Sequence, residues 1–333
     1  MGASEHRCGS SHRTRTLKDT GGSLKMTTLN ARVSRLVTPL GAFALLALGV
    51  PLATPSTAFG QEQVLYISAT GVTGSPVSDL TAEEIVVQWD GEDTEIVELE
   101  LIEWPVQVTM MVDNGRGGRE HIDQIRAGLK AFIAALPEGV EMALVATSDE
   151  VLSVTDYTSD KAALTAGVDE MERGNDDAYF LDAMIAAAAT VAAAEREFFP
   201  VFVNLATDKD EGSEGDQAAF EGMVNNVATN AGTVHTRLLY TEDGDADQSM
   251  QALVGPIGQQ TPGGSYEAIA DVTTLEANLT ALAENIARKN GLVSVQYRVR
   301  YNPPANAGPA PNISVASTRV GLNLIPTIDG NLP

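Results

Sequence analysis

Four aspartates stand where predicted strands end and loops begin, and they are the side chains of this sequence best suited to chemistry. Asp113 follows a long apolar run, and Asp208 follows another. Asp176 and Asp177 precede an alanine-rich segment. Hard divalent cations such as Mg²⁺ and Ca²⁺ prefer oxygen ligands of this kind. What these carboxylates bind, if anything, depends on how the predicted strands and helices place them.

The stretch 105–118, PVQVTMMVDNGRGG, positions the first of these carboxylates. Its apolar run has no polar alternation, which is typical of a strand buried on both faces of a parallel sheet. Gly115, Gly117 and Gly118 allow a tight turn after the strand. Open α/β sheets place their ligands at the carboxyl ends of strands. We therefore expect Asp113 to lie in the functional loop.

The rest of the central segment alternates strand and helix patterns. Further strands are predicted at 140–147, 151–157, 199–206 and 234–240, and helices at 119–136, 160–171, 178–194, 217–230 and 274–289, with a short helix ending at 254. The helix stripes are apolar at intervals of three and four residues. Such alternation predicts an α/β fold with a doubly wound, mostly parallel, Rossmann-like sheet.

The two ends of the mature chain have strand patterns of a different kind. Segment 61–104 contains a strand at 64–71 and a predicted hairpin, 85–89 with 96–102, around the turn Asp90-Gly91. The tail alternates apolar and polar residues from 293 to 301 and has a second predicted strand from 313 to 324. Because so few strands cannot form a stable domain alone, we expect 291–325 to pack with 61–104 as a small β unit. The α/β domain, 105–290, would then be inserted in it, and 326–333 would be a tail.

The N-terminus reads as a secretion signal. Residues 26–60 have a short basic start, an apolar stretch and small residues before a cleavage point after Gly60. Residues 1–25 read as an upstream extension. The single cysteine, Cys8, falls in that extension, so the mature chain would have no disulfide. We expect an exported protein, periplasmic or extracellular, without a membrane span in the mature chain.

The composition is strongly acidic and limits the partners. The net charge is −24 for the whole chain, and removing 1–60 leaves 14 basic and 43 acidic residues, a net charge of −29. Such a surface argues against nucleic acid and anionic lipid. It is compatible with cationic partners, with divalent cations, or with solubility alone. The histidines at 121 and 235 are isolated, and no hydrolase or phosphate-binding motif is present, so we expect no enzyme.

Two short motifs add a resemblance. Residues 80–85 read LTAEEI and are followed by Trp89-Asp90-Gly91, and residues 296–303 read QYRVRYNP. With the order of elements between them, these motifs resemble the von Willebrand factor A (VWA) family, in particular its bacterial secreted group. The resemblance covers nearly the whole mature chain. It implies the VWA fold and a role in protein binding.

The resemblance also implies a metal-ion-dependent adhesion site, made from D-x-S-x-S in one loop, a threonine in a second and an aspartate in a third. Asp113 matches the first aspartate and Asp208 the last, but Gly115 and Gly117 replace both serines. The threonine position falls near Asp177 or Ala178. The resemblance therefore implies a degenerate site, in which three hydroxyl ligands are missing.

Two interpretations of this site remain open. In one, Asp113, Asp177 and Asp208 still bind Mg²⁺ or Ca²⁺, and the protein is a metal-dependent adhesion module. In the other, the aspartates accept hydrogen bonds from nearby amides and hydroxyls, and no metal is obligatory. We expect the second: an exported, non-enzymatic module that binds an unknown protein partner. A metal-assisted hydrolase is the third alternative. The expected binding face is made of Asp113, Asn114, Arg116, Asp176, Asp177, Asp208 and Lys209.

Overall fold

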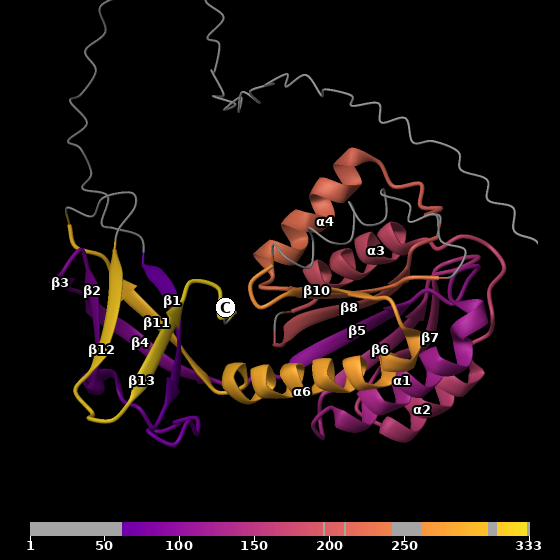
Figure 1. Ribbon diagram of the computed structural model, residues 1–333. Helices are drawn as coiled ribbons and strands as arrows, with labels where there is room; N and C mark the ends of the chain where they lie inside the picture. The colour runs from indigo at the N-terminus through magenta and orange to yellow at the C-terminus, as the bar shows by residue number, and fades with distance from the viewer. Residues whose placement is uncertain (1–61, 196, 210, 242–260, 306–311, 332–333) are drawn as a thin grey trace, which may run out of the picture. The chain divides into compact units, whose positions relative to one another are not determined.

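The computed structural model describes residues 62–195, 197–209, 211–241, 261–305 and 312–331 (Figure 1). These residues belong to one compact unit, Thr57–Pro333. The predicted signal peptide, the upstream extension and the short helix ending at 254 lie outside the described residues.

A six-stranded sheet forms the centre of the α/β domain. Its order is β10-β9-β8-β5-β6-β7, and only the β6–β7 pair is antiparallel. The strands are β5 (Val106–Val112), β6 (Glu141–Ala146), β7 (Leu152–Thr158), β8 (Phe199–Thr207), β9 (Thr233–Leu239) and β10 (Ser265–Ile269). All nine residues of β8 are buried, as an uninterrupted apolar run requires. The prediction of a doubly wound, mostly parallel sheet is confirmed.

Helices cover both faces of this sheet (Figure 1). One face packs against α1 (Ile122–Ala135), α2 (Lys161–Glu170) and α6 (Leu275–Val293), and the other against α3 (Phe180–Ala193) and α4 (Gln217–Thr229). Short 3₁₀ turns, η2 (Arg119–His121) and η3 (Val272–Thr274), precede α1 and α6. The start of helix α2 is set by a local contact, because the side chain of Asp160 accepts hydrogen bonds from the amides of Ala162 and Ala163, as the sequence predicts.

Strands from the two ends of the mature chain pair with one another. The four-stranded sheet has the order β13-β1-β11-β4, and the three-stranded sheet has the order β12-β2-β3. Their bounds are β1 (Gln63–Thr70), β2 (Ile85–Trp89), β3 (Glu92–Asp93), β4 (Glu95–Ile102), β11 (Gln296–Asn302), β12 (Ile313–Ser317) and β13 (Asn323–Thr327). Inward-facing residues of both sheets share one apolar core.

Three details of the sequence prediction are wrong here. The turn Asp90-Gly91 joins β2 to the two-residue β3, and β4 pairs with β11 instead. The predicted strand 313–324 is two strands, because a turn with Gly321 at φ +84° separates β12 from β13. Val293 ends α6, so the alternating strand begins only at Gln296.

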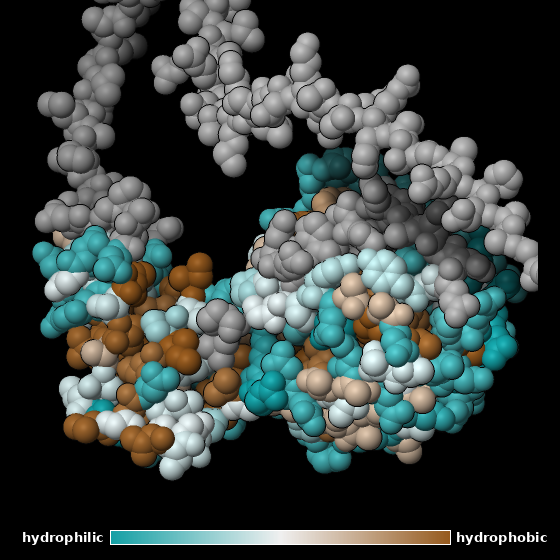
Figure 2. All heavy atoms as spheres, in the orientation of Figure 1, coloured by the Kyte–Doolittle hydropathy of each residue, from teal (hydrophilic) through white to brown (hydrophobic). Residues whose placement is uncertain are grey.

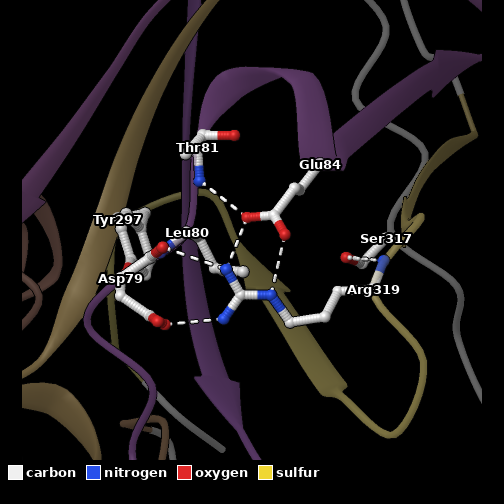
Figure 3. Close-up of polar contacts among 7 residues, drawn as sticks. All are labelled: Asp79, Leu80, Thr81, Glu84, Tyr297, Ser317 and Arg319. Atoms are coloured by element: carbon white, nitrogen blue, oxygen red, sulfur yellow. Dashed lines mark hydrogen bonds and ion pairs between the residues drawn. The ribbon is translucent and has the colours of Figure 1, made fainter.

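The structure explains the residues of the two short motifs (Figure 3). The hydroxyl of Tyr297, on β11, accepts a hydrogen bond of 2.9 Å from the amide of Leu80. Glu84, in the 3₁₀ turn η1 (Ala82–Glu84), accepts two hydrogen bonds from the guanidinium of Arg319, at 2.8 and 2.6 Å. The same guanidinium donates to Asp79 at 2.6 Å. Both motifs therefore join the N-terminal strands to the C-terminal ones.

The surface differs between the two sets of sheets. The visible face of the α/β domain is mainly hydrophilic, whereas the smaller sheets show more hydrophobic residues (Figure 2). Their exposed hydrophobics include Val72, Val320 and Ile328, each more than 80% exposed. In the described part of the chain, no helix is long and apolar enough to cross a membrane.

Candidate functional site

The carboxylate of Asp113 lies at the carboxyl end of β5 and is buried. One of its oxygens accepts hydrogen bonds from the amide of Gly115, at 2.9 Å, and from the hydroxyl of Ser148, at 3.2 Å. The other oxygen accepts a hydrogen bond from the hydroxyl of Thr207. Burial raises the pKa of the Asp113 carboxyl, and the hydrogen bonds from Thr207, Gly115 and Ser148 oppose that rise. Both oxygens of this carboxylate thus have donors within the protein.

Gly115 and Gly117, where the sequence resemblance would have serines, both pack against these hydroxyls. A Cβ atom on Gly115 would lie 2.1 Å from the Oγ of Ser148. A Cβ atom on Gly117 would lie 2.0 Å from the Oγ1 of Thr207. Such contacts are far inside van der Waals range, so a serine at either position requires the loop to move. The glycines leave the space through which Ser148 and Thr207 reach Asp113.

Asn114 joins the first loop to the second. Its side-chain oxygen accepts a hydrogen bond from the amide of Ser148, and its side-chain nitrogen donates to the carbonyl of Glu172, at 3.2 and 2.9 Å. Its own carbonyl accepts a hydrogen bond from the amide of Gly174. Asn114 is buried. The structure therefore places this residue of the expected binding face inside the loop cluster.

Arg116 and the paired aspartates form the exposed part of the same cluster. The amide of Arg116 donates to the carbonyl of Asp176 at 3.0 Å, and its guanidinium lies 3.2 Å from a carboxylate oxygen of Asp177. The amide of Asp176 donates to the carboxylate of Asp149 at 2.9 Å. Asp177, the aspartate expected to join Asp113 at a metal, thus has a cationic partner of its own.

Asp208 is the first residue of the third loop, directly after β8. It is buried, and one carboxylate oxygen accepts hydrogen bonds from the amide and the hydroxyl of Thr241, at 3.0 and 2.8 Å. Lys209 follows it and is half-buried, with its stem beside Gly117. Asp208 therefore links the end of β8 to the residues after β9.

Glu211 is a further functional element of the third loop. Its carboxylate accepts hydrogen bonds from the amides of Phe180, Leu181 and Ser213, at 3.2 to 3.3 Å. The first two amides belong to the start of α3, where helix N–H groups lack partners within the helix. Burial raises the pKa of Glu211. This residue holds the third loop against α3.

The arrangement brings three of the predicted loops together, but not as a cluster of carboxylates. Among the described residues, no group of three or more His, Cys, Asp or Glu side chains is placed to hold a metal ion. The direct hydrogen-bond partners of Asp113 are two hydroxyls and an amide. Outside them lies a rim of mixed charge, in which Arg116, Asp176 and Asp177 are exposed or half-exposed.

Sequence reasoning missed Ser148, Thr207 and Glu211 as members of this site. A signal for two of them is present, because Ser148 follows β6 closely and Thr207 ends β8, and both strands flank β5. Carboxyl ends of neighbouring parallel strands meet at one edge of a sheet. Glu211 has no comparable signal, because its place depends on how the third loop folds onto α3.

No protein-family model and no curated protein matches this chain. Solved structures do resemble it. A von Willebrand factor type A protein from Catenulispora acidiphila is 12% identical, with a TM-score of 0.44, over 80% of this chain and 72% of that protein. Manganese-loaded TRAP protein from Plasmodium vivax is 12% identical, with a TM-score of 0.41, over 72% of this chain and all of that one.

Proximal thread matrix protein 1 from the mussel byssus, in a structure described as having a zinc-occupied metal-ion-dependent adhesion site, is 10% identical with a TM-score of 0.44. The match covers 56% of this chain and 49% of the mussel protein, about half of its length. These likenesses are in fold, and the family that the sequence resembles is among the names they carry.

Proposed function

We propose that this chain is an exported, non-enzymatic protein-binding module of the VWA type, which binds its partner without an obligatory metal ion. The binding face is the exposed rim of the three loops, with Arg116, Asp176, Asp177 and Lys209. The leader pattern at 26–60 supports export. The resemblance of the short motifs supports the binding role by analogy.

The environment of Asp113 is the single observation that carries the metal-independent form. A divalent cation would compete for the lone pairs of this carboxylate with the hydrogen bonds that it accepts from Gly115, Ser148 and Thr207, which occupy three of about four acceptor positions. Serines at positions 115 and 117 would collide with the hydroxyls of Ser148 and Thr207 unless the loop moved. Internal donors take the role that the metal has in the family site. These internal donors support the proposal that no divalent cation is obligatory at Asp113.

The rim itself offers both signs of charge. Arg116 and Asp177 are paired at the surface, and surface ion pairs contribute little to stability, so they can exchange partners at little cost. Asp176 is exposed and Lys209 half-buried beside them. A protein partner with complementary charges would gain rate and specificity from such a face.

The test is affinity capture by the immobilised full chain from envelope extract and culture fluid of the source organism, followed by binding measurements with the captured protein. We expect equal affinity in EDTA and in millimolar Mg²⁺ or Ca²⁺. Asp176→Ala with Lys209→Ala should weaken binding about tenfold. The control is Glu138→Ala, in the loop before β6 at the opposite end of the sheet, which should bind like wild type.

Two outcomes would count against this function. If EDTA abolished binding and Mg²⁺ restored it, the module would be metal-dependent. If the rim variants bound as well as wild type, the binding face would lie elsewhere.

A further inference from the structure

A lysine and an asparagine meet at the end of the sheet opposite Asp113. Lys289, on the last turns of α6, donates hydrogen bonds from its ammonium group to the side-chain oxygen of Asn331 and to the hydroxyl of Thr233. Asn331 lies beyond β13, in the C-terminal segment. The two residues are 42 positions apart in the chain, so the contact joins a helix to a distant tail.

The contact is shielded from water. Thr233 is 0% and Asn331 3% exposed, and Lys289 is half-buried. Burial lowers the pKa of Lys289 to about 8, and the charge of Asp329 acts against that decrease. About a tenth of the amine is then neutral and nucleophilic at pH 7. An ordinary exposed lysine has a far smaller neutral fraction.

The carboxamide of Asn331 is held in a fixed position. Its nitrogen donates to the hydroxyl of Thr233 at 3.2 Å and to the carbonyl of Pro262 at 3.4 Å. The backbone amide of Asn331 donates to the carboxylate of Asp329 at 2.9 Å. The amine therefore faces the carbonyl group of an amide whose leaving nitrogen has its own partners. Holding two reacting groups in contact is what makes a slow reaction fast within one molecule.

We propose that Lys289 and Asn331 form an intramolecular isopeptide bond. The ammonium group first loses a proton, and we assign Asp329, whose charge acts on Lys289, as the base that takes it. The neutral Nζ then adds to Cγ of Asn331, a carbon–nitrogen bond forms, and the bond from Cγ to Nδ2 breaks. The leaving nitrogen takes up protons and departs as ammonium. One ammonium group and one carboxamide are consumed, and one secondary amide and one ammonium ion are formed, so no oxidant or cofactor is needed.

The bond would have a clear structural effect. The only cysteine of the chain is Cys8, so disulfides cannot brace residues 61–333. The tail is already positioned by Gln296, whose side chain donates to the carbonyl of Gly330 at 2.8 Å. A secondary amide would fix the tail to α6 covalently and would replace a buried cation by a neutral group. A cross-link of this kind limits the unfolded chain as a disulfide does.

Mass spectrometry of the purified full chain tests this directly. Trypsin should release residues 289–298 joined to 320–333, with a mass about 17 Da below the sum of the two peptides because ammonia is lost. Lys289→Met and Asn331→Ala should each yield the separate peptides. Asn331→Asp, if it links, should lose water instead of ammonia. The control Lys130→Arg changes an exposed lysine of α1, and the cross-linked peptide should remain.

Separate, unmodified peptides from the wild-type chain would overturn the proposal. So would a joined pair of the same two peptides in the digest of Lys289→Met. The measurement needs no variant to fold, because the wild-type digest alone decides whether the bond exists.

Discussion

Both ends of the central sheet hold an ionisable side chain among hydroxyls, buried for Asp113 and half-buried for Lys289, and they do so in opposite ways. At the carboxyl end, Asp113 accepts hydrogen bonds from Ser148, Thr207 and Gly115. At the amino end, Lys289 donates to Thr233 and Asn331. The first charge is surrounded only by donors and has nothing to react with.

The second charge faces a carboxamide, which an amine can attack. A buried charge can therefore be stabilised by hydrogen bonds alone, or the charge itself can be removed when a neutral bond forms. Under the two proposals above, the carboxyl end would be a rigid support for the binding rim, and the amino end would carry a covalent brace.

The largest effect is expected from Lys289→Met. If the cross-link exists, the variant loses a constraint on a loop of 42 residues, and its free energy of unfolding should fall by about 4 kcal/mol. If Lys289 is only hydrogen-bonded, methionine removes a buried cation and keeps the packing, so stability should be unchanged or higher. Urea unfolding followed by circular dichroism separates these results. The matched control is Lys130→Met on the surface of α1.

His235, near the amino end of strand β9, should make the free energy of unfolding fall in acid. Burial lowers the pKa of His235 to about 3, and the nearby charges of Arg237 and Lys289 act in the same direction. Between about pH 3 and pH 6.5 the unfolded chain therefore binds a proton on this ring that the folded chain does not, and the free energy of unfolding rises with pH. Its contribution between pH 4 and pH 7 is on the order of 3 kcal/mol.

The acid effect can be separated from that of Asp113 because the signs differ. A carboxyl whose pKa burial has raised binds its proton more tightly when folded, so its contribution to stability falls as pH rises above its usual range. Urea melts at several pH values should show a shallower dependence between pH 4 and 6.5 in His235→Gln. A slope equal to that of wild type would show that the ring is not buried as a neutral group.

A serine at position 117 tests whether the loop at the carboxyl end of the sheet has room for a larger side chain. Gly117→Ser restores part of the family motif, yet its Cβ would overlap the hydroxyl of Thr207, so we expect a loss of about 2 kcal/mol. Gly222→Ala is the control, because no atom lies within 4 Å of a Cβ added there, on α4. It should stabilise the protein by roughly 0.5–1 kcal/mol. A neutral or stabilising Gly117→Ser would mean that the loop has room for the family's ligands.

The smallest effect is expected at the third loop. Glu211→Gln keeps an acceptor oxygen for the amide of Leu181 but places an NH2 group where the other carboxylate oxygen accepted the amide of Phe180, at a cost of about 1 kcal/mol. Thermal melts at neutral pH measure this change. An increased melting temperature would show that the buried carboxylate is a liability and not a cap.

The sequence predicted the sheet well because its pattern is local. The unalternated run of β5 and the stripe of Ile125, Leu129 and Phe132 on α1 depend on neighbouring residues alone. The partner of β4 is set by a strand about 200 residues away, and a hairpin with β2 was the nearest local solution. The exact partner of β4 is therefore where the prediction failed.

The sequence predicted that Asp113 and Asp208 follow buried strands, as they do, but it did not predict their contacts. The glycines after Asp113 indicated where the strand ends, and the sequence left open whether a metal ion or hydrogen-bond donors of the protein contact the carboxylate of Asp113. Which hydroxyls fill the space left by Gly115 and Gly117 depends on the register of β6 and β8 beside β5, which periodicity does not reveal.

The most direct test of the account is a thermal melt of the full chain after chelation, alone and with millimolar Mg²⁺, Ca²⁺, Mn²⁺ or Zn²⁺, with Asp113→Ala in parallel. We expect no rise in melting temperature with any of the ions, and a lower melting temperature for Asp113→Ala because three donors lose their acceptor. A rise of several degrees in wild type that is absent in Asp113→Ala would contradict it, because it would show that the site binds a metal ion.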